Sequence, residues 1–126
     1  MQSALAQVRE WAARAQARAA ETQSLADAVA RVTATARDRS GAITVTVDAT
    51  GALVGLEFGD GIREFSPARL AEQVMQTVRA AQANLVAAVD SAVVTTVGAD
   101  SPIRAAVIDN LERRFGRPAD DGRSQA

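Results

Sequence analysis

The chain of 126 residues contains no cysteine, histidine, lysine or tyrosine. The absence of cysteine excludes disulfides and zinc–thiolate sites and fits a reducing cytoplasm. The absence of histidine and lysine excludes a serine triad, a Schiff-base amine and a Walker-type phosphate loop. The sequence therefore predicts a protein that is not an enzyme and that has no catalytic residue, metal or cofactor.

Carboxylates are the remaining side chains that could hold a metal. Those in the middle of the chain are Asp48, Glu57, Asp60 and Glu64. Their spacing is typical of strand and loop residues that keep a surface soluble, so we favour that interpretation over a magnesium site.

Aromatic residues make up only 3% of the chain, although 48% of it is hydrophobic. Much of the hydrophobic fraction is alanine, which buries little area per residue, so a monomer would have a thin core. This composition indicates an oligomer. No apolar run approaches ~18 residues and no charged-then-apolar leader begins the chain, so we expect neither a membrane span nor a secretory signal.

The charge is nearly balanced, with 14 basic residues, all of them arginine, against 15 acidic ones. Residues 1–39 carry six arginines and four carboxylates, or +2, whereas residues 40–65 carry one arginine and four carboxylates, or −3. A domain that binds nucleic acid through bulk charge is usually basic overall. Any anion-binding surface must therefore be local and built from the N-terminal segment.

Residues 41–58 alternate between apolar and polar side chains, which is the pattern of half-buried strands. Gly51 interrupts the run and accommodates a positive φ, so we expect a tight hairpin there. Residues 31–37 alternate as well, which predicts three consecutive antiparallel strands. The apolar positions expected to form the core or a dimer contact are Ile43, Val45, Val47, Val54, Leu56 and Phe58.

Residues 3–28 predict one long helix, because strong helix formers dominate and neither glycine nor proline interrupts them. At ~1.5 Å per residue this helix is roughly 39 Å long, more than a small sheet needs as a cover. Part of it should therefore project and pair with another helix. A seam of small side chains suits close helix packing, and its members are Leu5, Val8, Ala12, Ala15, Ala19, Thr22, Ala26 and Val29.

Two Ser-Pro pairs mark helix starts, because serine caps the first turn and proline tolerates the first helical position. Ser66-Pro67 begins a helix that we expect to reach about Thr95, and Ser101-Pro102 begins a short helix that ends at Gly116. The apolar stripe of the short helix favours packing on its own dimer over docking of a partner, and consists of Ile103, Val107, Leu111 and Phe115. The second helix has its own expected stripe of Leu70, Val74, Thr77, Ala81, Leu85, Ala88 and Ala92.

A few single residues can also be assigned. We expect Phe58 and Met75 in the core, with Ile62 and Phe65 packed onto it from the loop before the second long helix. Trp11, the only tryptophan, is expected to anchor an interface with another arm or with the third helix rather than to stack on a base.

Together these elements predict an α+β fold of long helix, three-stranded antiparallel sheet, long helix and short C-terminal helix. The stretch VTATARDRSGAITVTVDATGALVGLEF, followed by SPARLAEQVMQTVRAAQANL, resembles the YbaB/EbfC family of nucleoid-associated proteins. The resemblance is to its actinobacterial members in particular, some of which accompany type VII secretion loci. It covers about residues 5–95 and is a pattern of strands, turn and helix rather than a catalytic signature.

The resemblance implies a homodimer shaped like tweezers, with joined sheets and projecting helical arms, located in the cytoplasm on the nucleoid. Such proteins bind double-stranded DNA with weak sequence preference. The expected partners are therefore DNA and a second copy of the chain, without a membrane or a small-molecule substrate. The alternative is a dimeric interaction or scaffold protein, associated with type VII secretion, that has lost DNA binding.

Seven arginines are the candidate DNA contacts: Arg9, Arg14, Arg18, Arg31, Arg37, Arg39 and Arg79. Arginine binds phosphate through its planar fork, which positions a protein without reading sequence. Arg14 and Arg18 have acidic neighbours on their helix, so ion pairing on a solvated face is the favoured interpretation for them. The three near the sheet have only Asp38 beside them and are the stronger candidates, against a charged edge that discourages strand pairing.

The expected organisation is a YbaB/EbfC-like domain over residues 1–97, a C-terminal helix over 98–116 packed on it, and a disordered tail over 117–126. The basic residues Arg113, Arg114 and Arg117 could add phosphate contacts or could favour the C-terminus of the third helix.

Overall fold

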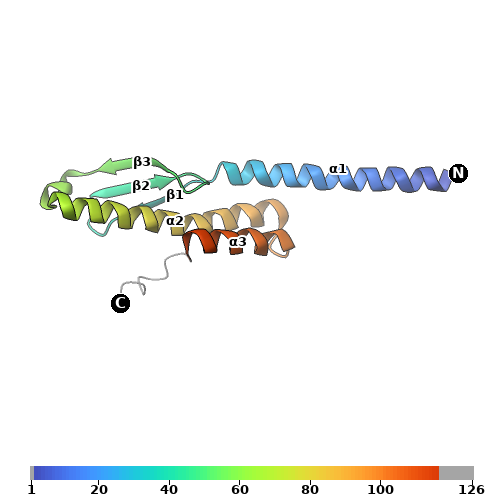
Figure 1. Ribbon diagram of the computed structural model, residues 1–126. Coiled ribbons are helices and arrows are strands. Elements are labelled where there is room, and N and C mark those ends of the chain that lie inside the picture. Colours follow the sequence, from blue (N-terminus) through green and yellow to red (C-terminus); the bar gives the residue numbers. More distant parts are fainter. Residues whose placement is uncertain (1, 117–126) are drawn as a thin grey trace.

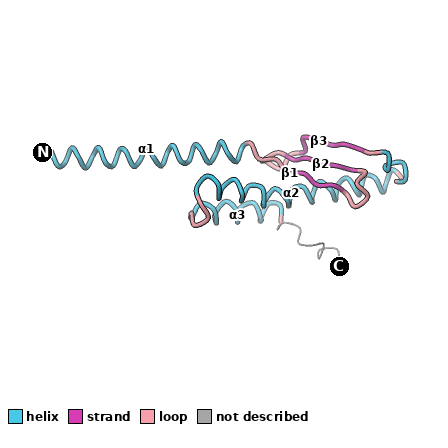
Figure 2. Tube along the Cα trace, turned by 180° about the vertical axis from the view of Figure 1, so that it is seen from behind, coloured by secondary structure: helices cyan, strands magenta, loops and turns pink. Residues whose placement is uncertain are grey.

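The computed structural model describes residues 2–116 and has an α+β architecture (Figure 1 and Figure 2). Its elements in order are α1 (Gln2–Ala30), β1 (Ala34–Arg37), β2 (Ile43–Val47), β3 (Leu53–Phe58), a 3₁₀ helix (Asp60–Glu64), α2 (Pro67–Val97) and α3 (Pro102–Phe115). This confirms the predicted fold class and the order of helices and strands. The expected tail, with Arg117, lies outside the described residues.

The three strands form one antiparallel sheet in the order β1-β2-β3. β1 is shorter than the predicted run over 31–37. The central strand β2 carries the core, since Ile43, Val45 and Val47 have no exposed surface. Burying each such side chain stabilises the fold by about 1.5–3 kcal/mol.

β3 departs from the predicted alternation at its start. A β-bulge sets Leu53, not Val54, opposite Val47. A bulge inserts one unpaired residue into a strand. The side chains before and after the insertion therefore no longer follow a single alternating pattern. Val54 is therefore not on the face shared by Leu56 and Phe58, where strict alternation over residues 41–58 would place it.

The face of β3 that continues the core surface of β2 remains open. Leu53, Leu56 and Phe58 are 47%, 41% and 46% exposed, because α2 packs against β1 and β2. Phe58 is thus not a core residue of the single chain. Met75 is not a core residue either, because its side chain is 52% exposed. It lies about 200° around α2 from the buried Thr77 and so faces away from the core.

α2 covers the sheet with one face and continues past it along α1 (Figure 1). Its buried residues are Thr77, Ala81, Leu85, Val86, Val89 and Val93. The stripe therefore agrees with the predicted one up to Leu85 and then passes through Val89 and Val93 instead of Ala88 and Ala92. Valine buries more apolar area than alanine, so the helix turns its valines inward.

α1 is an arm that touches the rest of the chain only near its C-terminal end (Figure 1). Leu25 is 8% exposed, whereas every side chain over 3–24 except the half-buried Ala12 is exposed. Of the predicted seam only Val29 packs against the core, whereas Ala26 is exposed and lies about 100° around the helix from Leu25. Trp11 is 67% exposed, and its expected packing on the third helix is not seen.

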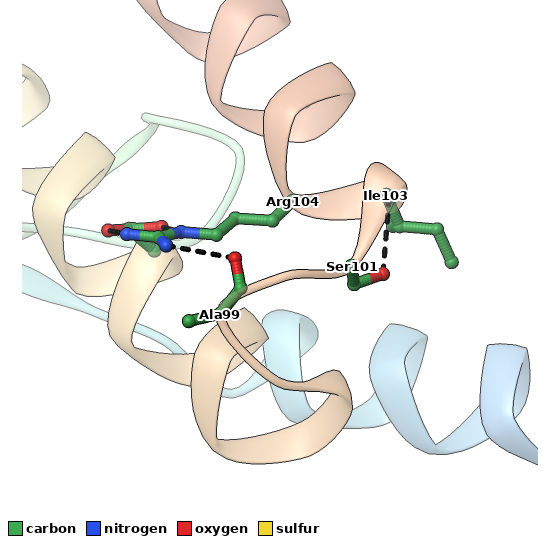
Figure 3. Close-up of polar contacts among 5 residues, drawn as sticks. Ala99, Ser101, Ile103 and Arg104 are labelled. Carbon is green, nitrogen blue, oxygen red and sulfur yellow. Dashed lines mark hydrogen bonds and ion pairs between the residues drawn. The ribbon is translucent and has the colours of Figure 1, made fainter.

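α3 packs on α2 and is held at its start by polar contacts. Arg104 of α3 donates from Nε to Oδ1 of Asp90 on α2 (2.7 Å) and from Nη2 to Oδ2 (3.0 Å). Its Nη1 donates to the carbonyl of Ala99 (3.1 Å), while Ser101 caps the helix by accepting from the Ile103 N–H (Figure 3). The bond from Arg104 holds the pKa of Asp90 below its usual value.

The β2–β3 turn joins the hairpin to both α2 and α3. Gly51 has a φ of +86° and is buried, with the Phe115 ring of α3 directly against it. Gln82 of α2 donates to the Gly51 carbonyl (3.0 Å). Asp48 fixes the turn by accepting from the hydroxyl of Thr50 (2.6 Å), which together with backbone donors lowers the pKa of its carboxyl.

Within residues 2–116, the helix α2 is long and apolar enough to cross a membrane, judged by length and composition only. Core helices pass the same test. Because α2 packs against β1, β2, α1 and α3, the match is weak evidence for a membrane span.

Candidate nucleic-acid interface

The candidate arginines lie at separate places on the molecule rather than along one surface. Arg9, Arg14 and Arg18 are on the projecting part of α1. Arg37 ends β1 and Arg39 lies in the next turn, at the end of the sheet that is remote from the arm (Figure 1). All of these side chains are exposed.

The arginines of the arm do not form a single row. Arg14 and Arg18 are one helical turn apart and share a face of α1. Arg9 lies about 140° around the helix from Arg14, because five residues separate them at 3.6 residues per turn. Two of the three can therefore contact the same phosphate strand.

Helical spacing favours the ion pairs Glu10–Arg14 and Arg18–Glu21, but neither is formed. Over residues 2–116, the ion pairs within 4.0 Å are Arg104–Asp90 and Arg113–Asp109. The interpretation of Arg14 and Arg18 as paired residues is therefore wrong, and their guanidinium groups remain available to an anion.

The three arginines near the sheet do not form one cluster. Arg31 follows α1 and precedes β1, whereas Arg37 is the last residue of β1. A four-residue strand spans roughly 13 Å, so the two lie at opposite ends of the sheet. Arg79 is exposed on α2.

A further arginine, Arg69, which is not among the seven candidates, lies at the same pocket as Arg37 and Arg39. This pocket of about 580 Å³ lies between the β1–β2 turn and the first turns of α2. A sequence signal for Arg69 does exist, since it lies in a first helical turn that contains no acidic residue. Carboxylates are the usual choice at that position because they complement the helix dipole.

The pocket is held in shape by local contacts. The Arg69 guanidinium carbon lies 5.6 Å from the centroid of the Phe65 ring. Asp38 supports the turn, because Oδ2 accepts from the Ser40 hydroxyl (2.6 Å) and Oδ1 from the Ile43 N–H (2.9 Å). Burial pushes the pKa of Asp38 upward, but these hydrogen bonds outweigh it and hold the pKa below its usual value.

The acidic residues of the middle segment do not converge. In the described part of the chain, no group of three or more histidine, cysteine, aspartate or glutamate side chains is placed to hold a metal ion. Glu57 lies on the sheet face opposite α2, paired with Thr44.

Residues 1–100 match the YbaB/EbfC DNA-binding family, and the chain belongs to that family. This is a family of nucleoid-associated DNA-binding proteins, so DNA is a partner of this chain. Comparison with curated proteins and with solved structures finds no match.

Proposed function

We propose that this chain acts as a homodimer that binds double-stranded DNA through arginine–phosphate contacts, with little preference for base sequence. The observation that carries the proposal is the state of the seven candidate arginines. Each is exposed, and none is ion-paired with a carboxylate over residues 2–116. Contacts of this kind fix the position of a protein on the duplex but carry no sequence information.

Local charge compensates for the net charge of −1. Arg14 and Arg18 project from an arm whose exposed part, residues 3–24, is roughly 33 Å long. That length is close to one turn of B-DNA. In a dimer each arginine occurs twice, so two arms present four such groups in addition to Arg9.

The homodimer is supported by the open face of β3. Leu53, Leu56 and Phe58 continue the apolar surface of β2, and β3 is an edge strand with free backbone groups. A second copy could cover this face, so we assign Leu56 and Phe58 to the dimer contact, with Val54 beside them. The alanine seam of α1 is equally free and suits close packing of a second helix.

The DNA proposal is tested with a fluorescent random-sequence duplex and anisotropy at about 50 mM salt, using Arg14→Gln/Arg18→Gln. We expect its affinity to fall by tenfold or more, because four charge-assisted contacts are lost per dimer. The matched control is Arg113→Gln, since that guanidinium is already paired with Asp109. Equal losses in the two proteins, or no binding by the wild-type chain, would contradict the proposal.

The dimer is tested by light scattering after size exclusion. Leu56→Glu places a charge on the open face and is expected to give a monomer with unchanged circular dichroism. Glu57→Gln, the neighbour on the other face, should remain dimeric. A wild-type monomer, or a dimer that survives Leu56→Glu, would refute this assignment.

A second candidate is the scaffold function without DNA binding, in an actinobacterial member associated with type VII secretion. It is favoured by the exposure of Leu5, Val8 and Trp11 on the arm, at 54%, 60% and 67%. Failure of the wild-type chain to bind a duplex at about 50 mM salt would favour it. Under the first candidate, the protein resides on the nucleoid in the cytoplasm, with residues 1–97 as the DNA-binding domain and 98–116 as a helix that buttresses it.

A further inference from the structure

The pocket at the end of the sheet has the features of an anion site that is separate from the arm. Three arginines from two elements line it: Arg37 and Arg39 from the β1–β2 turn region, and Arg69 from α2. No ion pair within the described residues neutralises any of them. Asp38 is the one carboxylate in the lining, so the lining keeps a net charge of +2.

The Asp38 carboxylate does not compete for these guanidinium groups. Both of its oxygens accept hydrogen bonds from the turn itself, from the Ser40 hydroxyl and the Ile43 N–H. Over residues 2–116 the guanidinium of Arg37 makes a single long hydrogen bond, to the Gly41 carbonyl (3.5 Å), and that of Arg39 makes none. The charged part of the lining is therefore rich in free donors and poor in free acceptors.

The neutral part of the lining adds two side-chain amides, each with an NH2 donor and a carbonyl acceptor. The side-chain amides of Gln73 and Gln76 line the pocket and make no hydrogen bond to another described residue. Phe65 holds the guanidinium of Arg69 by a cation–π contact, which restricts its orientation before a ligand arrives. A volume of about 580 Å³ exceeds the needs of a single phosphate and lies in the range of small-molecule sites.

We propose that this pocket, lined by Arg37, Arg39 and Arg69, binds two or three linked phosphate groups. Such a ligand could be a free oligophosphate or nucleoside polyphosphate, or neighbouring phosphates of a nucleic-acid backbone. Arginine forks bind phosphate oxygens bidentately, and the pocket carries three of them. The pocket does not depend on the arm. With backbone phosphates as ligand, the proposal rests on the proposed function and adds Arg69 to its contacts; with a free phosphate compound as ligand, it goes beyond that function.

The test is isothermal titration of the full chain with inorganic triphosphate in the absence of DNA and divalent cations. We expect one site per chain, and a loss of affinity of roughly tenfold in Arg39→Gln and in Arg69→Gln. Arg113→Gln is the control, since Arg113 is on α3, outside the pocket lining, and is already paired with Asp109. Circular dichroism confirms that each variant is folded.

Absence of triphosphate binding, or an equal loss in Arg113→Gln, would overturn the proposal. The source of the phosphate is distinguished by repeating the series with the duplex. If Arg39→Gln and Arg69→Gln weaken both ligands, the pocket takes backbone phosphates; if they weaken triphosphate alone, its ligand is a free phosphate compound. Because the first titration contains no DNA, failure of the DNA proposal leaves its result unaffected.

Discussion

Gly51 is the position where one added carbon atom should disturb the packing most. It lies in the β2–β3 turn with a φ of +86°, and a Cβ built there would approach Cζ and Cε1 of Phe115 to 2.5 and 2.7 Å. Gly51→Ala therefore has two costs. The left-handed backbone conformation costs roughly 1–2 kcal/mol for a residue with a Cβ. The ring must also leave its place, which loosens the end of α3.

We expect Gly51→Ala to lower the free energy of unfolding by about 2–4 kcal/mol, counting the backbone conformation and the partial loss of Phe115 burial. For a chain of this size, 1 kcal/mol corresponds to about 4 °C in Tm, so the Tm should fall by about 8–16 °C. The measurement is thermal unfolding followed by circular dichroism. Protein concentration is held fixed, because self-association would make Tm depend on it.

Phe115→Ala separates the two costs in a double-mutant cycle. Without the ring there is no clash, so Gly51→Ala in that background should cost only about 1–2 kcal/mol. The double variant is then more stable than the sum of the single changes predicts. Equal costs in both backgrounds would refute the contact between Gly51 and Phe115, and a neutral Gly51→Ala would refute the left-handed turn.

Three further outcomes follow from the packing and the pKa shifts. Leu85→Ala, at a fully buried position of α2, should cost about 2–5 kcal/mol in urea unfolding, whereas Ala87→Ser on the exposed side should cost less than about 1. Asp90→Asn should lower the free energy of unfolding by less than about 1 kcal/mol, because the side chains of Asp90 and Arg104 are 31% and 37% exposed. In this variant, hydrogen exchange should increase in α3 before it does in β2. The folded-state pKa values of Asp48 and Asp90 are lowered, so at acid pH the unfolded chain binds more protons than the folded chain. The stability that these two carboxylates contribute is therefore present above pH ~4 and is lost as pH falls below it. Asp48→Asn should reduce this loss of stability in acid, measured as the urea unfolding midpoint over a pH series.

Local sequence signals were sufficient for the elements themselves. The Ser-Pro starts of α2 and α3, the unbroken helix-forming run of α1 and the alternation in β2 each have a direct physical cause in a short window. The bulge at Val47 has no such signal, because it depends on how β3 fits against β2. For the same reason alternation alone could not predict that Leu53, rather than Val54, lies on the same face as Leu56 and Phe58.

The candidate site was predictable only residue by residue. Exposed arginines can be identified on a helix or in a turn, but Arg69 reaches the pocket because α2 begins beside the β1–β2 turn, which is a tertiary fact. The same holds for Arg31, which is close to Arg37 in sequence but lies at the other end of a strand. The ion pairs expected for Arg14 and Arg18 were not formed, since an exposed pair gains only a few tenths of a kcal/mol.

The central claim is that exposed arginines of this chain bind DNA phosphates. Its most direct test is the dependence of duplex affinity on salt between about 50 and 200 mM, measured by anisotropy. If the four copies of Arg14 and Arg18 in a dimer each contact a phosphate, the slope of log Kobs against log salt concentration should be about −3.6 or steeper. Changing both residues to glutamine should reduce the magnitude of the slope by about 3.6. A wild-type slope near zero, or no binding at the lowest salt, would contradict the account.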